Sequence, residues 1–372
     1  MEARSRERES RRLRHIYYSI ISVDNLLEAW REFLCGKRSR KDVAEFSLHL
    51  TDHIMELHQE LSENSYCHGG YVAFKVNDPK PRDIHKASVK DRLVHHALYR
   101  VLYPHFDRKF IHDSYSCRIG KGTQRAMNRF REFGRKVSRN HTRTVWVLKC
   151  DIRKFFASID HAVLKNILRK YIEDIDTLWL LDQVIDSYHE GGKVGIGLPL
   201  GNLTSQLLVN IYMNKFDQFV KRHLKARYYI RYADDFVILH ESRDYLESLL
   251  PQMSAFLEMR LRVNLHPKKV TITTLASGVG YLGWVHFPHH RVLRTVTKHR
   301  MFRRLENWSS QESVASYLGL LSHGNAYGHE IAIKQIANQG SKTTLKSNRS
   351  ESVIWNPDFS ANLTNKKNSS HG

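Results

Sequence analysis

Residues 228–239 have the sequence YYIRYADDFVIL, in which two adjacent carboxylates separate two runs of residues that favour β-strands. This pattern predicts a hairpin with Asp234 and Asp235 at its tip. An isolated pair of this kind would be weak evidence for a site, because turns favour Asp. The pair becomes a candidate metal site if a third carboxylate reaches it from elsewhere in the chain.

Asp151 is the candidate for this third carboxylate. It follows another β-type run, VWVLKC at residues 145–150. Two strands that each present an Asp at one edge of a sheet provide what two-metal phosphoryl transfer requires, and carboxylate oxygens suit the hard cation Mg²⁺. The predicted core of the sheet consists of residues 145–151, 228–233 and 235–240.

The charge of the whole chain indicates a polyanionic partner. The 372 residues include 59 Lys and Arg against 38 Asp and Glu, which gives a formal net charge of +21. This excess favours nucleic acid as the partner, with a basic protein that has no such partner as the alternative.

No apolar run reaches the roughly 18 residues of a membrane span, so no membrane contact is expected. Four widely spaced cysteines match no zinc pattern and favour a reducing cytoplasm.

The remaining sequence predicts further elements. Apolar residues at helical spacing predict helices at about 16–34, 42–61, 89–103, 123–137, 161–172, 177–189 and 203–224, and a basic helical segment at 297–333. Further β-structure is expected at 66–76, and a strand pair at 270–275 and 279–286 joined by Ala276-Ser277-Gly278. The basic arm at 1–14 and the Ser-, Asn- and Lys-rich C-terminal tail are predicted to be disordered.

Taken in order, these blocks resemble a reverse transcriptase, over about residues 20–330. The resemblance implies an α/β (α+β) right-hand polymerase fold with a palm, interleaved fingers and a short helical thumb. It makes Asp151, Asp234 and Asp235 the expected catalytic and metal-binding residues, with two Mg²⁺ ions per active site. The domains expected on this basis are an arm and N-terminal helical region at 1–75, fingers and palm at 76–290, a thumb at 291–335 and a tail at 336–372.

The same resemblance implies a set of nucleotide contacts. Phe156 would lie under the sugar of the incoming nucleotide and select deoxynucleotides, because its ring leaves no room for a 2′-hydroxyl. Adjacent side chains on an extended backbone point apart, so either Phe155 or Phe156 must enter the core. The other expected nucleotide-binding residues are Arg82 and Arg92, which would clamp the triphosphate, with Leu200, Gly201 and Lys269.

Other blocks are expected to contact nucleic acid. Residues 280–284 resemble the primer-grip hairpin, where small residues allow the backbone to approach the primer. Asp160 is expected to cap the helix that starts at His161 rather than to bind metal. For the thumb arginines, ordinary surface charge is the alternative. The expected nucleic-acid-binding residues are Arg118, Lys121, Tyr281, Leu282, Gly283, Arg300, Arg303 and Arg304.

The stretch GLPLGNLTSQ at residues 197–206 points to one branch of the family. Many reverse transcriptases carry Gln between this Pro and Gly, followed by a Ser-Pro pair. This chain has Leu200 and Ser205-Gln206 instead, which is similar to the enzymes of diversity-generating retroelements. An apolar residue in place of a polar one that holds nucleotide or template would loosen geometric selection. Core packing of Leu200 in an accurate enzyme is the alternative. Ala233 departs from the Met that many relatives of this type carry.

The resemblance implies error-prone copying of a template-repeat RNA for mutagenic retrohoming, in the cytoplasm of a bacterium and encoded by it or by a phage. The implied partners are the template RNA, the primer and RNA/cDNA duplex, deoxynucleoside triphosphates and a small basic accessory variability protein. Two alternatives stay open. One is a defence-associated, retron-type or intron-type reverse transcriptase of ordinary fidelity. The other is a catalytically inactive RNA-binding protein, against which the three aspartates argue.

Overall fold

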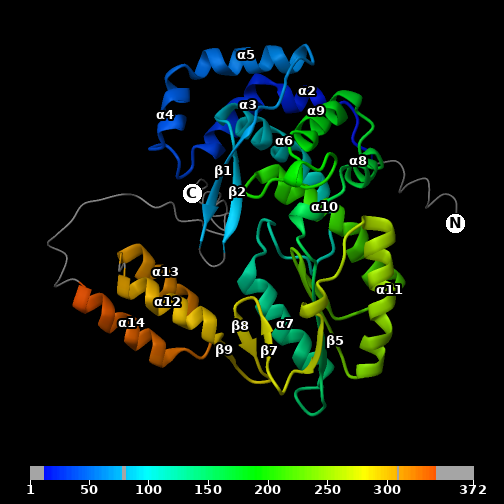
Figure 1. Ribbon diagram of the computed structural model, residues 1–372, viewed down its shortest axis with the longest axis vertical. Coiled ribbons are helices and arrows are strands. Elements are labelled where there is room, and N and C mark those ends of the chain that lie inside the picture. The colour runs from blue at the N-terminus through cyan, green and yellow to red at the C-terminus, as the bar shows by residue number, and fades with distance from the viewer. Residues whose placement is uncertain (1–11, 78–80, 308–309, 341–372) are drawn as a thin grey trace, which may run out of the picture. The chain divides into compact units, whose positions relative to one another are not determined.

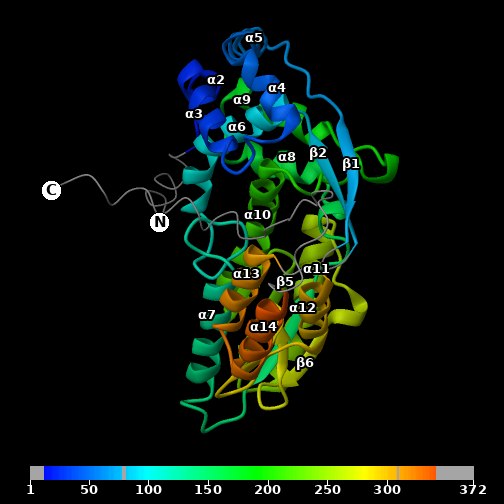
Figure 2. The same ribbon diagram turned by 90° about the vertical axis from the view of Figure 1, so that its left-hand side faces the viewer.

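The structure is a computed structural model that describes residues 12–77, 81–307 and 310–340 (Figures 1 and 2). Most of the predicted arm and tail therefore lies outside the described residues. The contacts divide the chain into two compact units. Unit 1 comprises the described residues of Met1–His112, Ile152–Lys225 and Pro251–His266, and unit 2 those of Asp113–Asp151, Ala226–Leu250 and Pro267–Gly372. The linear domain boundaries given above stay predictions.

Unit 2 is built around a four-stranded sheet of order β4-β5-β3-β6. β3 (Trp146–Asp151) lies antiparallel to β5 (Asp235–His240), and β4 (Tyr229–Tyr232) forms a hairpin with β5. One face of these strands buries Val147, Ile230 and Val237, because alternate residues of a strand point to the same side. The predicted hairpin and three-stranded core are confirmed.

The predicted strand pair at 270–275 and 279–286 is wrong as a pair. β6 (Thr271–Thr274) pairs with β3 instead. A separate antiparallel sheet contains β7 (Val279–Tyr281), β8 (Trp284–His286) and β9 (Arg291–Leu293). The chain does turn in the predicted linker: Gly278 has a φ of +88°, and a Cβ there would lie 2.8 Å from the Phe287 ring. The turn leads into a new sheet rather than back along β6.

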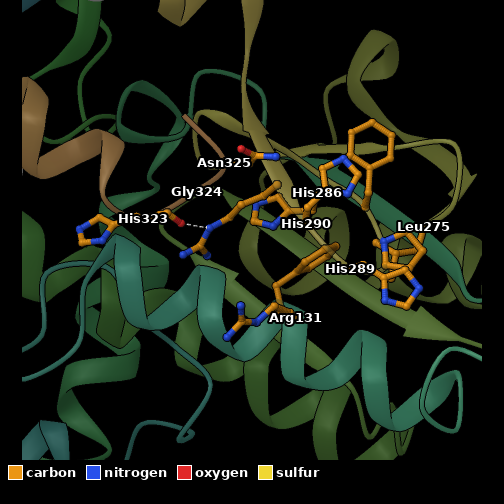
Figure 3. Close-up of a pocket in the computed structure, with 12 residues that line it drawn as sticks. Arg131, Leu275, His286, His289, His290, His323, Gly324 and Asn325 are labelled. Carbon is orange, nitrogen blue, oxygen red and sulfur yellow. Dashed lines mark hydrogen bonds between the residues drawn. The ribbon is translucent and has the colours of Figure 1, made fainter. Parts of the chain in front are cut away.

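α7 (Thr123–Val137) matches the predicted basic helix residue for residue and packs its apolar face on the four-stranded sheet. Three helices replace the single segment predicted at 297–333: α12 (Thr295–Asn307), α13 (Gln311–Leu321) and α14 (Tyr327–Gly340). They share a second apolar cluster with Met127 of α7 and the fully buried Trp284 of β8. A cavity of about 200 Å³ opens among α7, the β8–β9 turn and residues 323–325 (Figure 3).

Unit 1 is mainly helical. Predicted helix 16–34 is two helices, because the Ser22 hydroxyl accepts a hydrogen bond from Asn25 N and starts a new one. Predicted helix 42–61 is likewise divided at His49. The helices described are α2 (Tyr17–Ile21), α3 (Val23–Phe33), α4 (Lys41–Leu48), α5 (Leu50–Ser62), α6 (Val89–Asp107), α8 (His161–Arg169), α9 (Ile175–Asp186) and α10 (Leu203–Gln218), which a π-helical turn (Phe219–His223) extends.

Besides β9 and the short 3₁₀ turns, two elements were not predicted. β2 (Arg82–Ala87) pairs with β1 (Tyr71–Val76) as an antiparallel hairpin of unit 1. α11 (Arg243–Leu261) starts in the unit 2 segment that ends at Leu250 and continues in the unit 1 segment that starts at Pro251. The predicted cap at Asp160 is confirmed, because its side chain accepts a hydrogen bond from Val163 N at 2.9 Å. Among the described helices, none is long and apolar enough to cross a membrane.

Candidate active site

The register of the four-stranded sheet brings three carboxylates to one end of it. Asp151, the last residue of β3, is the cross-strand partner of Asp235, the first residue of β5. Tyr232 pairs with Asp235 from the other side, so Ala233 and Asp234 form the two-residue tip of the hairpin. The sheet therefore gathers the three residues that the sequence selected. Their catalytic role stays a prediction.

These acids affect one another's ionisation. Burial, together with the charges of Asp235 and Asp151, raises the pKa of Asp234 to about 6. Burial also raises the pKa of Asp235, where the Asp151 charge adds to the effect and Lys149 opposes it. Three acids this close cannot all ionise without repulsion. The cluster therefore favours a bound cation.

Two lysines near the carboxylates offset part of their negative charge. Lys269 Nζ donates a hydrogen bond to Asp151 Oδ1 at 2.8 Å. Lys149 Nζ lies 3.7 Å from Asp235 Oδ1, beyond hydrogen-bond distance, and donates to the Gly280 carbonyl oxygen at 2.9 Å. Lys269 was predicted as a nucleotide contact, whereas Lys149 was missed. The signal for Lys149 was available, since it is the one charged side chain within the apolar run 145–150.

The donor chemistry of the cluster fits Mg²⁺. All three side chains offer oxygen ligands, and Asp235 Oδ1 is buried and accepts no hydrogen bond from any described residue. Mg²⁺ is usually bound by one or two carboxylates plus substrate phosphates rather than by a closed protein cage. Within the described residues, no group of three His, Cys, Asp or Glu side chains is already arranged as a metal site. Asp151, Asp234 and Asp235 are the residues that would hold the metal.

The hairpin tip is held by a residue that the sequence did not single out. Arg231 is fully buried, and it donates hydrogen bonds to the Ala233 carbonyl oxygen and to Ser114 Oγ, both at 3.1 Å. Ala233 has a φ of +54°, a conformation that is usually adopted by Gly in two-residue hairpin turns. A non-glycine residue there costs about 1–2 kcal/mol. Arg231 thus positions the turn that carries Asp234.

Of the residues expected around the nucleotide in unit 1, Leu200 and Gly201 lie in the loop before α10, and Phe156 opens a 3₁₀ turn at Phe156–Ser158. Phe155 is buried and Phe156 is half-buried, so Phe155 is the core member of the pair. The Leu200 carbonyl oxygen accepts a hydrogen bond from His85 N at 3.0 Å, which joins this loop to β2. Gly201 has a φ of +106°, and a Cβ there would lie 2.8 Å from Ile84 Cγ2. Only glycine therefore suits this close approach.

The two predicted triphosphate arginines lie in different settings. Arg82 is exposed at the start of β2. Arg92 is on α6, where its guanidinium forms an ion pair with Asp42 Oδ2 at 2.6 Å. Binding of a triphosphate by Arg92 would require this pair to open. The nucleotide role of both residues stays a prediction.

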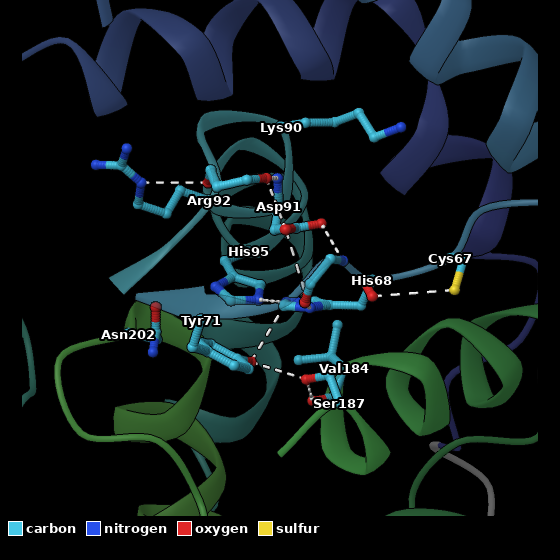
Figure 4. A network of polar contacts seen from close by, with 12 residues as sticks. Cys67, His68, Tyr71, Lys90, Asp91, Arg92, His95, Val184, Ser187 and Asn202 are labelled. Atoms are coloured by element: carbon cyan, nitrogen blue, oxygen red, sulfur yellow. Dashed lines mark hydrogen bonds and ion pairs between the residues drawn. The ribbon is translucent and has the colours of Figure 1, made fainter. Parts of the chain in front are cut away.

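A buried polar network beside Arg92 joins α6 to the root of the β1–β2 hairpin (Figure 4). Asp91 accepts hydrogen bonds from Ser88 Oγ at 2.6 Å and Tyr66 Oη at 2.7 Å, which lower its pKa although burial opposes them. His68 Nε2 lies 3.1 Å from His95 Nε2, and burial lowers the pKa of His95 to about 3. A neutral His95 can share one proton with His68 in an N–H···N bond. The network anchors the hairpin.

The residues expected to contact nucleic acid in unit 2 differ in accessibility. Arg118 is buried and donates to the Ser114 carbonyl oxygen at 2.9 Å, which gives it a structural role. Lys121 lies over the Tyr115 ring, 5.2 Å from its centroid. Tyr281 is fully buried, so only its backbone can approach a ligand. The more accessible candidates are Leu282 and Gly283 in the β7–β8 turn and Arg300, Arg303 and Arg304 on α12.

Comparisons with known proteins agree with this geometry. The family model "Reverse transcriptase (RNA-dependent DNA polymerase)" matches residues 75–286. Protein YkfC of Escherichia coli is 26% identical over 270 residues, which cover 62% of this chain and 68% of YkfC. Group II intron-encoded protein LtrA of Lactococcus lactis is 22% identical over 285 residues, which cover 58% of this chain and 45% of LtrA.

A solved structure of apo telomerase from Candida tropicalis has a similar fold. The TM-score is 0.51 with 12% sequence identity, and the match covers 75% of this chain and 58% of the telomerase chain. The chain thus spans less than two thirds of LtrA and of this telomerase. At this identity the likeness concerns the fold alone. With the family match, it confirms the α/β right-hand polymerase fold predicted from the sequence.

Proposed function

The chain belongs to the reverse transcriptase family of RNA-directed DNA polymerases, and from this premise we propose that it synthesises DNA on an RNA template at Asp151, Asp234 and Asp235. The observation that carries the proposal is the register that pairs Asp151 with Asp235 beside the tip residue Asp234. Membership of the family implies divalent-metal catalysis, a template RNA, a primer and deoxynucleoside triphosphates.

The proposed metal is Mg²⁺, as two ions held by Asp151 and Asp234 with Asp235 as the adjacent acid. The chemistry that bound Mg²⁺ supplies is activation of the primer 3′-hydroxyl and neutralisation of charge on the departing pyrophosphate. The chain's own residues would position these groups. Arg231 fixes the hairpin tip, and Lys269 would exchange its pairing with Asp151 for the triphosphate, a more highly charged partner.

Replacement of Asp234 by Asn tests the proposal. Primer extension on a defined RNA template with Mg²⁺ and four deoxynucleotides should give no detectable product, because the amide cannot replace a metal-binding carboxylate. Binding of RNA, measured by fluorescence anisotropy, should persist. The control is Glu258→Gln, the same loss of charge at an exposed side chain of α11, which should extend primers normally. Synthesis by Asp234→Asn at the wild-type rate would reject the metal-site assignment.

We further propose that the copying is error-prone and serves mutagenic retrohoming in a diversity-generating retroelement, with a small basic accessory protein as partner. The support is the sequence of residues 197–206, with Leu200 where many relatives carry Gln. Deep sequencing of the cDNA should show errors concentrated opposite template adenines. The same assay with and without the encoded neighbouring basic protein would test whether it controls fidelity.

The similarity to a group II intron-encoded protein favours a second candidate, an intron-type enzyme of ordinary fidelity. Accurate cDNA, with and without the accessory protein, would select this candidate and leave the polymerase assignment intact. RNA binding without any product would instead select the third possibility, a non-catalytic RNA-binding protein.

A further inference from the structure

A basic cavity lies in unit 2, and none of the roles above uses it. It is the space among α7, the β8–β9 turn and residues 323–325, and it adjoins a second, more open hollow of about 350 Å³ that shares Arg131, Pro288 and His289 with it. Figure 3 shows Arg131, His289, His290 and His323 around this space. We refer to the two hollows together as the basic cavity.

The basic cavity is remote from the three carboxylates. Leu275 lines it, and Leu275 N donates a hydrogen bond to the carbonyl oxygen of Val145, just before β3. Asp151 is at the other end of β3, about 20 Å away at the usual rise of a strand. The β8–β9 turn is also at the opposite end of β8 from Leu282 and Gly283, the predicted primer-grip turn. The basic cavity is therefore separate from both sites.

The cations of this surface lack counter-charges. Arg131 and Arg135 are exposed one helical turn apart on α7, and neither guanidinium group forms an ion pair or hydrogen bond within the described part of the chain. Among the residues that the structure describes, Glu132 is the only acidic one that lines the two hollows. Its carboxylate is already paired with Arg129 at 2.8 Å and Lys136 at 2.6 Å. The surface is therefore strongly positive.

A third arginine is fixed in place at the cavity wall. Arg291 is half-buried, with Nε donating to the His323 carbonyl oxygen and Nη1 donating to Asn128 Oδ1 at 3.2 Å. Burial and the nearby Arg131 charge lower its pKa. Holding two cations together without an anion is unfavourable. An anion in the basic cavity would remove this penalty, and guanidinium groups suit phosphate.

Flat rings border these cations. His290 stacks on Phe287 with a centroid distance of 4.8 Å and an interplanar angle of 14°, and His141 contacts His289 at 4.5 Å. His289 and His290 are exposed. Aromatic and imidazole rings beside arginines are the surfaces on which unpaired bases stack, whereas a base-paired duplex offers only its backbone and grooves.

We propose that the basic cavity binds the phosphate backbone of an unpaired RNA segment that lies outside the copied duplex. The cations continue along α7 across two adjoining hollows, which suits successive phosphates of a strand better than a single free phosphate. The inference rests on the proposed use of RNA by this chain, and it does not depend on the fidelity of copying.

The test is a salt series of RNA binding with two matched double variants. R131A/R135A removes two exposed guanidinium groups that form no ion pair or hydrogen bond within the described residues, so the fold should be unaffected. R38A/R260A removes the same charge from exposed arginines elsewhere, whose side chains likewise form no ion pair or hydrogen bond within the described residues. A labelled single-stranded RNA is titrated by fluorescence anisotropy, with excess unlabelled primer–template present. Circular dichroism spectra verify that both variants are folded.

R131A/R135A should reduce the slope of log affinity against log salt by about 1.4 relative to wild type, which is about a tenfold loss of affinity near 0.15 M salt. R38A/R260A should change the salt slope and the affinity far less. Equal losses in the two variants, no loss in either, or displacement of the RNA by primer–template would overturn the inference. An equal loss for DNA of the same sequence would overturn the assignment to RNA.

Primer extension with the same wild-type preparation separates this inference from the proposed function. Arg131- and Arg135-dependent RNA binding without synthesis would reject the polymerase proposal and keep the cavity. Synthesis together with identical RNA binding by the two double variants would keep the polymerase proposal and reject the basic cavity as an RNA-binding site.

Discussion

Replacement of Asp234 by Asn should make the metal-free protein more stable than the wild type above about pH 6, and it should abolish synthesis. Asp234 is half-buried at the hairpin tip, and burial and the charges of Asp235 and Asp151 raise its pKa to about 6. Its carboxylate is therefore held in an unfavourable environment. Asn has nearly the same shape without the charge, so it removes the repulsion and leaves the turn in place.

The direction and size of the effect follow from this pKa. An acid whose pKa is higher in the folded than in the unfolded chain binds more protons when folded, so the free energy of unfolding falls as pH rises through that window. For Asp234 the window extends from 3.8 to about 6. The whole difference corresponds to about 3 kcal/mol. Because the side chain is partly open to solvent, we expect about 1–2 kcal/mol.

Urea unfolding with a chelator present, at several pH values from about 4 to 8, measures this difference. The wild type and Asp234→Asn should have similar stability near pH 4 and diverge up to about pH 6, with the variant the more stable. Glu258→Gln, which removes an exposed carboxylate, should show no such divergence. Addition of Mg²⁺ should stabilise the wild type more than the variant. Equal stability at pH 8, or a difference that does not vary with pH, would refute the electrostatic account of the cluster.

Three further substitutions test other features. In urea unfolding, Gly324→Ala should lower the free energy of unfolding by about 1–3 kcal/mol, because the new Cβ would lie 2.0 Å from Cζ3 of the buried Trp284. Gly319 lies within α13 with open space around it, so Gly319→Ala should raise the free energy of unfolding by up to about 1 kcal/mol. Similar effects of the two substitutions would contradict the close packing of Gly324 on Trp284. Ala233→Gly should raise the free energy of unfolding by about 0.5–1 kcal/mol, because Gly adopts a positive φ without strain. A lower free energy of unfolding would show that the hairpin tip is unstrained. Leu200→Gln should lower errors opposite template adenines in sequenced cDNA; an unchanged error rate would remove this residue from the fidelity proposal.

The part of the fold that carries the carboxylates was predictable because its signals are local. The hairpin is marked by β-prone residues on either side of an acidic turn, and the strand before Asp151 by a continuous apolar run. α7 was predicted with its bounds because Gly122 precedes it and its apolar residues keep helical spacing. In the observed antiparallel register of β3 and β5, Asp151 then pairs with Asp235.

Other elements escaped because their signals are non-local or weak. β6 was assigned to the following strand, since neighbours in sequence usually pair, whereas it pairs with β3 more than a hundred residues earlier. β2 has the polar sequence RDIHKA, which lacks the alternation of a half-buried strand. α11 contains Pro251, a residue that normally argues against a helix interior.

The partners of charged side chains were also beyond the sequence. Arg92 pairs with Asp42, which belongs to a helix far away along the chain. Arg231 lies between the strand-forming residues Ile230 and Tyr232, and nothing in these neighbours indicates that its guanidinium turns inward to the Ala233 carbonyl. Such pairs depend on which surfaces the tertiary fold brings together.

The pairing of Asp151 with Asp235 also affects how this region tolerates mutation. Backbone hydrogen bonds set the register between β3 and β5, and the side-chain period of a strand is two residues. Deletion of a single residue between Trp146 and Cys150 would turn the remaining side chains to the opposite face and shift Asp151 past its partner. Conservative exchanges among the buried apolar residues leave the spacing intact. In a deletion and substitution scan of this strand, one-residue deletions should therefore inactivate the protein far more uniformly than substitutions.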